Sequence, residues 1–271
     1  MRWLREQPEF AVLVRDAYYD DPLAAAAERY RASLEWSAIR ALLPNPRGTA
    51  LDVGAGRGIA SYALAREGFQ VTALEPDPSP LVGSGAIRAL ARDARVEIGV
   101  LEGFSEAVPC PDACFDLVLA RAVLHHARDL KRACGEFFRV LRPGGMLLAA
   151  REHVISAPEH LEAFLDQHPL HHMYGGEHAF MLDEYITAIR DAGFAEPRVL
   201  TPLSSGINFA PRTSEELRHE IADRMVGGIP ILRTIARTTI SMPMVWAFVR
   251  PILERIDNRP GRLFSFVAVK P

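Results

Sequence analysis

The sequence predicts a doubly wound α/β fold with a seven-stranded sheet, an amino-terminal helical cap and a helical insertion before the last strand. Three observations lead to this prediction. From residue 49 onward, short β-rich runs alternate with segments of helical periodicity. A glycine-rich turn, residues 54–58, follows the first of these runs and opens a helix. Beyond Arg151 the alternation loosens, and a long helical stretch separates the last two strand candidates. Strands that alternate with helices form a parallel sheet, covered on both faces, with its ligand at the carboxyl ends of the strands.

The composition is that of an ordinary globular chain. Of the 271 residues, 49% are hydrophobic and 24% are charged, values that exclude a disordered, collagen-like or disulfide-scaffold protein. The formal net charge of -3 argues against sequence-independent binding of nucleic acid, which requires a dense lysine and arginine surface. Three cysteines suit a reducing compartment, and the charged amino terminus lacks the apolar core of a secretory signal. We therefore expect a cytoplasmic protein with no nucleic-acid partner.

Residues 1–46 are predicted to form the helical cap. An Asp-Pro pair at 21–22 precedes an alanine-rich run, and Tyr30, Leu34 and Ile39 then recur at roughly helical spacing. Tyr19, within this cap, is a candidate to reach a bound substrate.

Residues 47–204, including the loop 153–180, are predicted to form the α/β core, which the final strand in residues 261–271 completes. Glycine and proline punctuate its helices, as at Gly68 and at the Pro-Gly-Gly sequence 143–145. The strands are expected at 50–53, 71–74, 96–101, 115–120, 146–150, 198–203 and 263–270, and the helices at 57–67, 80–93, 128–141, 158–166 and 182–192.

Residues 205–260 are predicted to be a helical lid or substrate insertion, because a long segment between two strands is typical of a cover over a site. The stretch 213–257 mixes apolar and arginine residues, so it could line an acceptor pocket, contact a membrane surface or form a dimer contact. Arginines and prolines interrupt its apolar part, which excludes a helix that spans a bilayer. We expect a monomer or a homodimer, with peripheral membrane contact left open.

The glycine-rich turn 54–58 stands where a nucleotide-binding loop would. Glycines let the backbone turn tightly and bring amide groups close to a ligand. Glu75 ends the second strand about 20 residues later, where a carboxylate can hold ribose hydroxyls. The dinucleotide fingerprint would place glycine or alanine at position 59, and the chain has Ile59 there. The motif therefore favours a cofactor other than NAD.

Several motifs in order resemble one enzyme family. The stretches are 52–58, the Glu-Pro pair 75–76, and the segments 102–109, 115–126 and 139–145. Together, over residues 48 to about 152, they resemble the class I S-adenosylmethionine (SAM)-dependent methyltransferases, specifically the group with a methyltransferase 11 type core. The resemblance implies a Rossmann-like sheet, SAM as cofactor, S-adenosylhomocysteine as product, and methyl transfer.

The resemblance also implies roles for single residues. The glycines of the loop would hold the methionine part of SAM, Asp52 would organise the loop, and Glu75 would bind the ribose. Arg121 would lie beside the sulfonium. Relatives often carry aspartate where Phe104 stands, so apolar packing and a backbone contact near Ser105 are expected to hold the adenine here. The expected cofactor-binding residues are Asp52, Gly54, Ala55, Gly56, Gly58, Glu75, Pro76, Gly103, Phe104, Ser105 and Arg121.

Eight of the nine histidines lie between positions 125 and 178, in segments expected at the carboxyl edge of the sheet. Methyl transfer mainly requires alignment of the reacting atoms, but a hydroxyl acceptor must also lose its proton, which histidine is suited to take. The catalytic candidates are His125, His126 and His153. The expected substrate-binding residues are Tyr19, Arg151, His171, His172, Tyr174, Glu177 and His178.

A metal ion is not expected. His153, His172, Glu177 and His178 are chemically able to bind zinc, iron or magnesium, but their spacing matches none of the standard helix-borne metal motifs.

The predicted function is SAM-dependent O-methylation of a small-molecule acceptor, a hydroxyl of a sugar or secondary metabolite, with a histidine as general base. Methylation of carbon or nitrogen stays open. An NAD(P)-dependent oxidoreductase is a second alternative, disfavoured by Ile59 and by the lack of a recognisable Tyr-x-x-x-Lys pair. A SAM-binding scaffold without turnover is a third.

Overall fold

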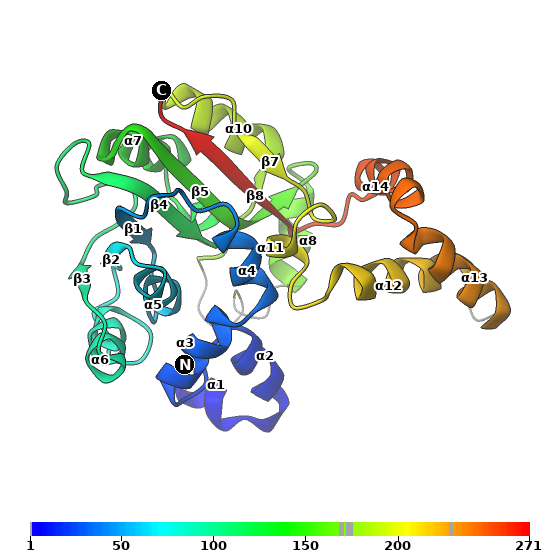
Figure 1. Ribbon diagram of the computed structural model, residues 1–271, viewed down its shortest axis with the longest axis horizontal. Coiled ribbons are helices and arrows are strands. Elements are labelled where there is room, and N and C mark those ends of the chain that lie inside the picture. Colours follow the sequence, from blue (N-terminus) through cyan, green and yellow to red (C-terminus); the bar gives the residue numbers. More distant parts are fainter. Residues whose placement is uncertain (1, 168–170, 172–175, 228–229) are drawn as a thin grey trace.

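One sheet organises the chain (Figure 1). The computed structural model describes residues 2–167, 171, 176–227 and 230–271. Within these residues the sheet has eight strands in the order β3-β2-β1-β4-β5-β8-β7, with β6 paired to β5 beside this path. The strands are β1 (Thr49–Val53), β2 (Gln70–Leu74), β3 (Ile98–Leu101), β4 (Phe115–Arg121), β5 (Leu141–Ile155), β6 (Phe180–Met181), β7 (Arg198–Leu200) and β8 (Arg262–Val269).

The predicted doubly wound fold is confirmed, with two differences. Strands β1 to β5 are parallel, but β8 runs antiparallel to both β5 and β7, so the sheet is mixed. The short strand β6 was not predicted. It pairs with the last two residues of β5, where a two-residue run carries too little periodicity to recognise.

The strand order reverses between β1 and β4, because the chain adds β2 and β3 on one side of β1 and then returns to the other side. In open α/β sheets this reversal leaves a crevice beyond the carboxyl ends of the two strands. The turn after β1 and the segment after β4 therefore flank the natural place for a ligand.

Apolar side chains alternate across the strands and form one core on each face of the sheet. On one face, strand residues such as Leu117 and Leu148 pack with the cap and the helix after β1. On the other, Leu51 and Val118 pack with the helices after β4 and β6. Figure 1 shows these helices above and below the sheet. They are α5 (Ile59–Arg66) and α6 (Ser84–Ala94) on the cap side, and α7 (Leu130–Val140) and α10 (Leu182–Asp191) on the other.

The amino-terminal cap is helical, as predicted. It contains α1 (Arg2–Glu6), a 3-10 turn η1 (Pro8–Phe10), α2 (Ala11–Asp16), α3 (Leu23–Arg31) and α4 (Leu34–Arg40). Ser33 begins α4 by accepting the backbone N–H of Trp36 at 3.1 Å. The Trp36 ring is fully buried and packs in the same hydrophobic core as residues of α5. The cap is thereby docked on the sheet next to the crevice.

Strand β5 extends past its predicted end. The charged sequence Arg151-Glu152-His153 marks the predicted end, but the strand continues to Ile155 through an irregularity at Arg151, whose φ is +60°. The Arg151 N–H donates to Ser265 Oγ at 3.0 Å, which holds this bulge against β8. The bulge places the Arg151 and His153 side chains at the crevice, whereas the Glu152 side chain between them is fully buried.

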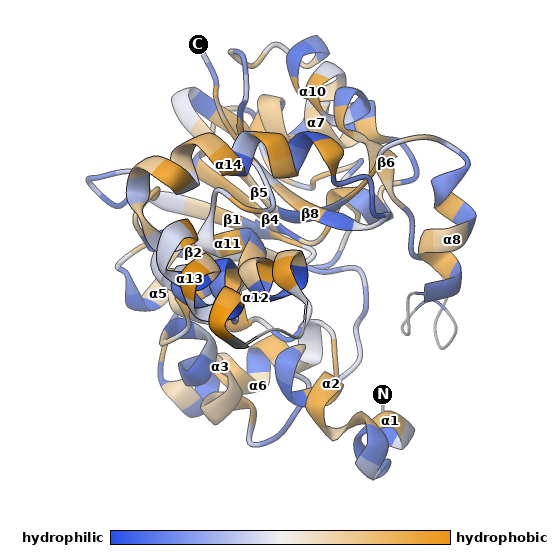
Figure 2. Cartoon of the chain, turned by 90° about the vertical axis from the view of Figure 1, so that its right-hand side faces the viewer, coloured by the Kyte–Doolittle hydropathy of each residue, from blue (hydrophilic) through white to orange (hydrophobic). Residues whose placement is uncertain are grey.

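The predicted insertion is helical and stands away from the sheet (Figure 1). After α11 (Gly206–Phe209) it comprises α12 (Ser214–Val226), α13 (Pro230–Ser241) and α14 (Pro243–Ile256). The last three helices, which we call the arm, share a small core of Ala222, Ile240 and Trp246. Figure 2 shows apolar residues along α13 and α14, several of them exposed. In the part of the chain that the structure describes, none of the helices has the length and apolarity needed to cross a membrane.

Candidate active site

A cavity of about 1080 Å³ lies at the carboxyl ends of β1, β2, β4 and β5. Residues of the cap, the glycine loop, the segment after β4 and the bulge of β5 surround it. Most residues expected at the site line it: Tyr19, Asp52, Gly54, Ala55, Gly56, Glu75, Pro76, Gly103, Phe104, Ser105, Arg121, His125, His126, Arg151, His153 and Glu177. The topology thus brings together side chains that are up to 158 positions apart, from Tyr19 to Glu177.

Three expected residues lie elsewhere. Gly58 precedes α5 with φ +81°, and a Cβ there would lie 3.1 Å from the Ile87 side chain, so close packing against α6 explains this glycine. His171 lines a separate small pocket beside α8 (His160–Gln167). His178 packs its ring on Phe180, with the ring centroids 4.5 Å apart. His172 and Tyr174 lie outside the described residues.

Two glycines of the loop have backbone conformations that other residues rarely adopt. Gly54 and Gly56 have φ values of +58° and +54°, a region that favours glycine. A Cβ at Gly54 would lie 2.7 Å from Val123 Cγ2, whereas at Gly56 the nearest atom would be 4.0 Å away. Gly54 therefore permits close approach of the segment after β4, and Gly56 leaves open space on the cavity side.

Glu75 is anchored at the end of β2. Its Oε2 accepts the Gly56 N–H at 2.7 Å, and its Oε1 accepts the Asp77 N–H at 3.0 Å. Burial raises the pKa of the Glu75 carboxyl, although both hydrogen bonds act in the opposite direction. Each carboxylate oxygen keeps further acceptor capacity, so the group can hold hydroxyls as well as the loop.

Asp52 lies at the floor of the loop and is almost fully buried. The Ser61 hydroxyl donates to its Oδ2 at 2.5 Å. Burial raises the pKa of Asp52 to about 7, against the lowering effects of Ser61 and Arg121. The carboxyl ties the end of β1 to α5, in keeping with its expected role in organising the loop.

The two arginines share one carboxylate from the cap. Arg121 donates from Nε and Nη2 to the two oxygens of Glu35, at 2.5 and 3.0 Å, and Arg151 Nε lies 3.6 Å from Oε2. The Tyr30 hydroxyl donates to Oε1 at 3.1 Å. Burial alone would raise the pKa of Glu35, but the two guanidinium groups and Tyr30 hold it below its usual value. The Arg121 charge, expected beside the sulfonium, is thus offset by Glu35.

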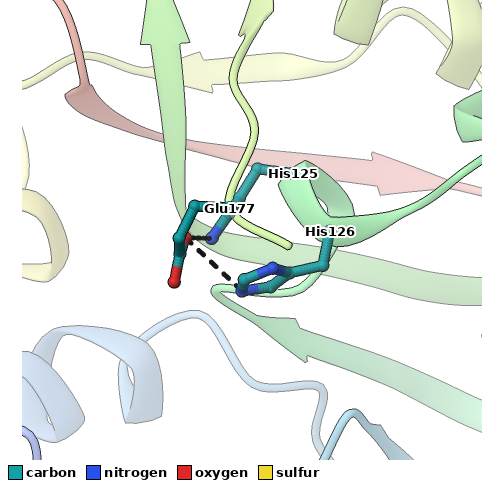
Figure 3. A group of neighbouring side chains, drawn as sticks. All are labelled: His125, His126 and Glu177. Carbon is teal, nitrogen blue, oxygen red and sulfur yellow. Dashed lines mark ion pairs between the residues drawn. The ribbon is translucent and has the colours of Figure 1, made fainter. Parts of the chain in front are cut away.

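Three histidine rings line the same cavity. His125 and His126 belong to the short 3-10 turn η2 (Leu124–His126), and His153 comes from the bulge of β5. The His125 ring contacts those of His126 and His153, with centroids 4.2 and 4.7 Å apart. Glu177 approaches the first two rings from the loop before β6 (Figure 3).

Each of these rings has a partner that defines its proton position. Nδ1 of His125 lies 2.7 Å from Glu152 Oε2, Nδ1 of His126 lies 3.0 Å from the Gly176 carbonyl, and Nδ1 of His153 lies 3.0 Å from the Gly261 carbonyl. A carbonyl or carboxylate oxygen accepts only, so all three Nδ1 atoms carry the hydrogen. In the neutral ring Nε2 is then the basic nitrogen. The cavity therefore contains imidazoles with a single defined tautomer.

The core matches known proteins. Residues 51–149 match the family of methyltransferase domains. Over 130 residues the chain is 33% identical to an uncharacterized methyltransferase of Mycobacterium sp. (strain JLS), which covers 48% of this chain and 46% of that protein. It is 34% identical over 102 residues to a ubiquinone biosynthesis O-methyltransferase of Methylobacterium sp. (strain 4-46), covering 38% of this chain and 40% of that one. Residues 51–149 of this chain are thus similar to a methyltransferase domain.

The fold of the core is similar to that of solved methyltransferase structures. One is phosphoethanolamine N-methyltransferase 2 of Haemonchus contortus in complex with phosphomonomethylethanolamine and S-adenosylhomocysteine. It has a TM-score of 0.56 at 19% identity and covers 88% of this chain and 52% of that chain. This likeness concerns the fold. The chain spans about half the length of the curated relatives it matches.

Two buried carboxylates, Glu35 and Glu152, are not among the expected cofactor-binding, catalytic or substrate-binding residues. Glu152 has a local signal, because it stands between Arg151 and His153 directly after a buried strand. Glu35 belongs to the cap, whose helices could reach the pocket, but no local pattern pairs it with Arg121, which is 86 positions away. Both accept hydrogen bonds from residues that line the cavity, so they act by positioning them.

Proposed function

We propose that this chain transfers the methyl group of SAM to a hydroxyl oxygen of a small molecule, such as a sugar or secondary metabolite. The observation that carries the proposal is that one cavity contains both parts the reaction needs. One part of the cavity lining contains the glycine loop and Glu75. Another part contains imidazoles whose Nε2 atoms are basic. The first part suits an adenosyl cofactor, and the second suits an acceptor that must lose a proton.

The residues on the cofactor side fit SAM. Gly56 leaves room beside the loop, Glu75 is oriented to accept ribose hydroxyls, and the Phe104 side chain is 62% exposed at the cavity, which offers an apolar surface to the adenine. The bound cofactor supplies an electrophilic methyl group and a neutral leaving sulfur. Tyr19, from the cap, would border the acceptor on the cavity side of the sheet.

His153 is the proposed general base. The Gly261 carbonyl holds its Nδ1–H, so Nε2 is the nitrogen that can accept a proton. The Nε2 atoms of His125 and His126 lie 3.6 and 3.8 Å from Glu177 Oε2. As the acceptor oxygen bonds to the methyl carbon, the carbon–sulfur bond breaks and the hydroxyl proton passes to His153 Nε2.

Calorimetric titration with SAM, S-adenosylhomocysteine and NADH tests the cofactor part of this proposal. We expect micromolar binding of both adenosyl ligands and none of NADH. Binding of NADH alone would reject SAM as the cofactor and favour an NAD(P)-dependent oxidoreductase.

Incubation with methyl-labelled SAM and a panel of hydroxyl-, amine- and carbon-acid acceptors tests the reaction. We expect label in a hydroxyl product, and a slower rate for His153→Gln with SAM affinity unchanged. Label only on nitrogen or carbon would reject the oxygen acceptor, and binding of SAM without any labelled product across the panel would favour a scaffold.

A further inference from the structure

We propose that His125, His126 and Glu177 form a binding site for a divalent transition-metal ion at the side of the cofactor cavity. The described residues contain this one group of three side chains with potential ligand atoms within 4.8 Å of one another. Figure 3 shows both rings and the carboxylate turned toward a common point. The site differs from the set of histidines that the sequence suggests, because Glu177 is about 50 positions from the two histidines and no local spacing rule joins them.

The distances suit ligands of one ion better than hydrogen bonds. Nε2 of His125 lies 3.6 Å from Glu177 Oε2, and Nε2 of His126 lies 3.8 Å from the same oxygen. Hydrogen bonds between nitrogen and oxygen are about 2.7–3.2 Å long. Ligand bonds of about 2.1 Å at tetrahedral or octahedral angles place neighbouring donor atoms roughly 3–3.5 Å apart. Both nitrogen–oxygen distances exceed this spacing by less than about 1 Å, and all three ligand atoms lie within 4.8 Å of one another.

The outer hydrogen bonds prepare both rings for this role. Nδ1 of His125 donates to Glu152 and Nδ1 of His126 donates to the Gly176 carbonyl, so both Nε2 lone pairs are directed at the Glu177 carboxylate. Metal-binding histidines almost always donate their other ring N–H to a carboxylate or a backbone carbonyl in this way. Three electron-rich atoms that face one another repel, and a cation between them removes that repulsion.

Glu152 makes the arrangement rigid. It is fully buried, accepts the backbone N–H groups of Val123 and His125 at 3.1 and 3.0 Å, and accepts His125 Nδ1–H as well. A buried carboxylate needs nearby positive charge or several donors. Together, the Glu152 and Glu177 carboxylates match the charge of a divalent cation.

The donor set defines the class of ion. Two imidazole nitrogens and one carboxylate oxygen suit zinc or ferrous iron, whereas magnesium and calcium prefer oxygen ligands throughout. All three residues line the cavity, so coordination positions not filled by protein face the proposed acceptor. On the basis of the proposed function, an acceptor hydroxyl bound there would ionise at a lower pH and pass its proton to the neighbouring His153.

Metal titration of the chelator-treated full chain tests the site without SAM or acceptor. We expect calorimetry to show one Zn²⁺ bound per chain, Co²⁺ to give visible absorption bands of a nitrogen- and oxygen-ligated ion, and Mg²⁺ not to compete. Glu177→Gln and His126→Gln should each weaken Zn²⁺ binding by about 100-fold or more, and Glu152→Gln, which acts through His125, by about 10–100-fold. The matched controls Glu215→Gln and His219→Gln lie on α12, outside the cavity lining, and should leave Zn²⁺ affinity unchanged.

Urea unfolding followed by circular dichroism shows whether the same variants are folded, independently of SAM binding. Absence of Zn²⁺ binding, binding that survives both Glu177→Gln and His126→Gln, or equal competition by Mg²⁺ would overturn the site. Failure of the proposed function gives a different result, namely Zn²⁺ binding with no SAM binding or no labelled product.

Discussion

Single residues in this cavity are held by contacts that a small change can remove. Gly54 and Gly56 share a left-handed backbone, but only Gly54 has a neighbour, Val123, within van der Waals distance of the missing Cβ. Asp52 is a buried carboxyl with a single close hydroxyl donor, Ser61. The two glycines allow backbone strain to be separated from a steric clash. Asp52 allows the effect of burying a carboxyl group to be measured.

We predict that Gly54→Ala impairs SAM binding more than Gly56→Ala does. Both variants place a side chain at positive φ, at about 1 kcal/mol each. Only Gly54→Ala adds the clash with Val123, so its SAM affinity should fall by a further ~10-fold. Calorimetry measures both affinities. The double variant Gly54→Ala/Val123→Ala should recover most of the difference, and equal losses in the two single variants would show that the clash with Val123 is not what matters.

We predict that Asp52→Asn changes how stability depends on pH. The pKa of Asp52 is raised to about 7 in the folded chain, above its ordinary value near 3.8, because burial disfavours the charge. Its contribution to stability is thus fully present below about pH 4 and is lost as pH rises through 7. Relative to the native chain, Asp52→Asn should gain about 4 kcal/mol of unfolding free energy between pH 4 and pH 8.

Urea unfolding without ligand at these two pH values measures that difference. The exposed Asp93→Asn variant is the control, and its unfolding free energy should stay parallel to that of the native chain. Parallel curves for Asp52→Asn as well would show that folding does not raise the pKa of Asp52.

At the scale of elements, the cap is joined to the sheet by charge as well as by packing. Glu35 on α4 faces Arg121 at the end of β4 and Arg151 in the bulge of β5. Two half-buried guanidinium groups therefore share one carboxylate, and Arg151 also donates to the Ile207 carbonyl. Removal of one partner from a buried ion pair leaves an uncompensated charge, which is more damaging than the pair itself is stabilising.

We predict an asymmetry between the two sides of this cluster. Glu35→Gln leaves both arginines without their carboxylate and should destabilise the chain by about 3–5 kcal/mol. Arg121→Met still leaves Arg151 beside Glu35 and should cost about half as much. Urea unfolding of both variants and of the double variant measures this. If Arg121→Met were the more damaging change, Arg151 would not share the Glu35 charge.

At the scale of the whole molecule, the arm is separate from the cavity. Its helices α12 to α14 have their own small core around Trp246, and the described residues of the arm contribute nothing to the cavity lining. In this structure the described residues of the arm do not cover the cavity as the predicted lid would. The arm instead projects from the side of the sheet (Figure 1).

We predict that Trp246→Ala loosens the arm and leaves the cavity intact. Loss of a buried aromatic side chain costs about 3–5 kcal/mol where it packs. Here its apolar cluster lies within the arm, apart from Leu203. Limited proteolysis should become faster between residues 212 and 258, with SAM affinity unchanged within about twofold. A parallel loss of SAM affinity would mean that the arm closes over the cavity in solution.

Local patterns in the sequence determined the strands β1 to β5, the helices between them and the glycine loop. These features depend on residues that are close in the chain: an apolar run, a glycine with positive φ such as Gly54, or a carboxylate such as Glu75 at the end of a strand. Their physical causes are hydrophobic periodicity and backbone sterics, which can be recognised from a few neighbouring residues in the sequence.

The tertiary structure alone decided which polar side chains meet. Glu35 is 86 positions from Arg121, Gly176 is 50 positions from His126, and the bulge at Arg151 turns Glu152 toward His125. Such pairs arise from sheet order and from burial, which makes a charged group find a partner wherever the fold supplies one. The sequence therefore indicated a cofactor loop and a histidine-rich edge, whereas folding selected which histidines share Glu177 and which one is oriented by Gly261.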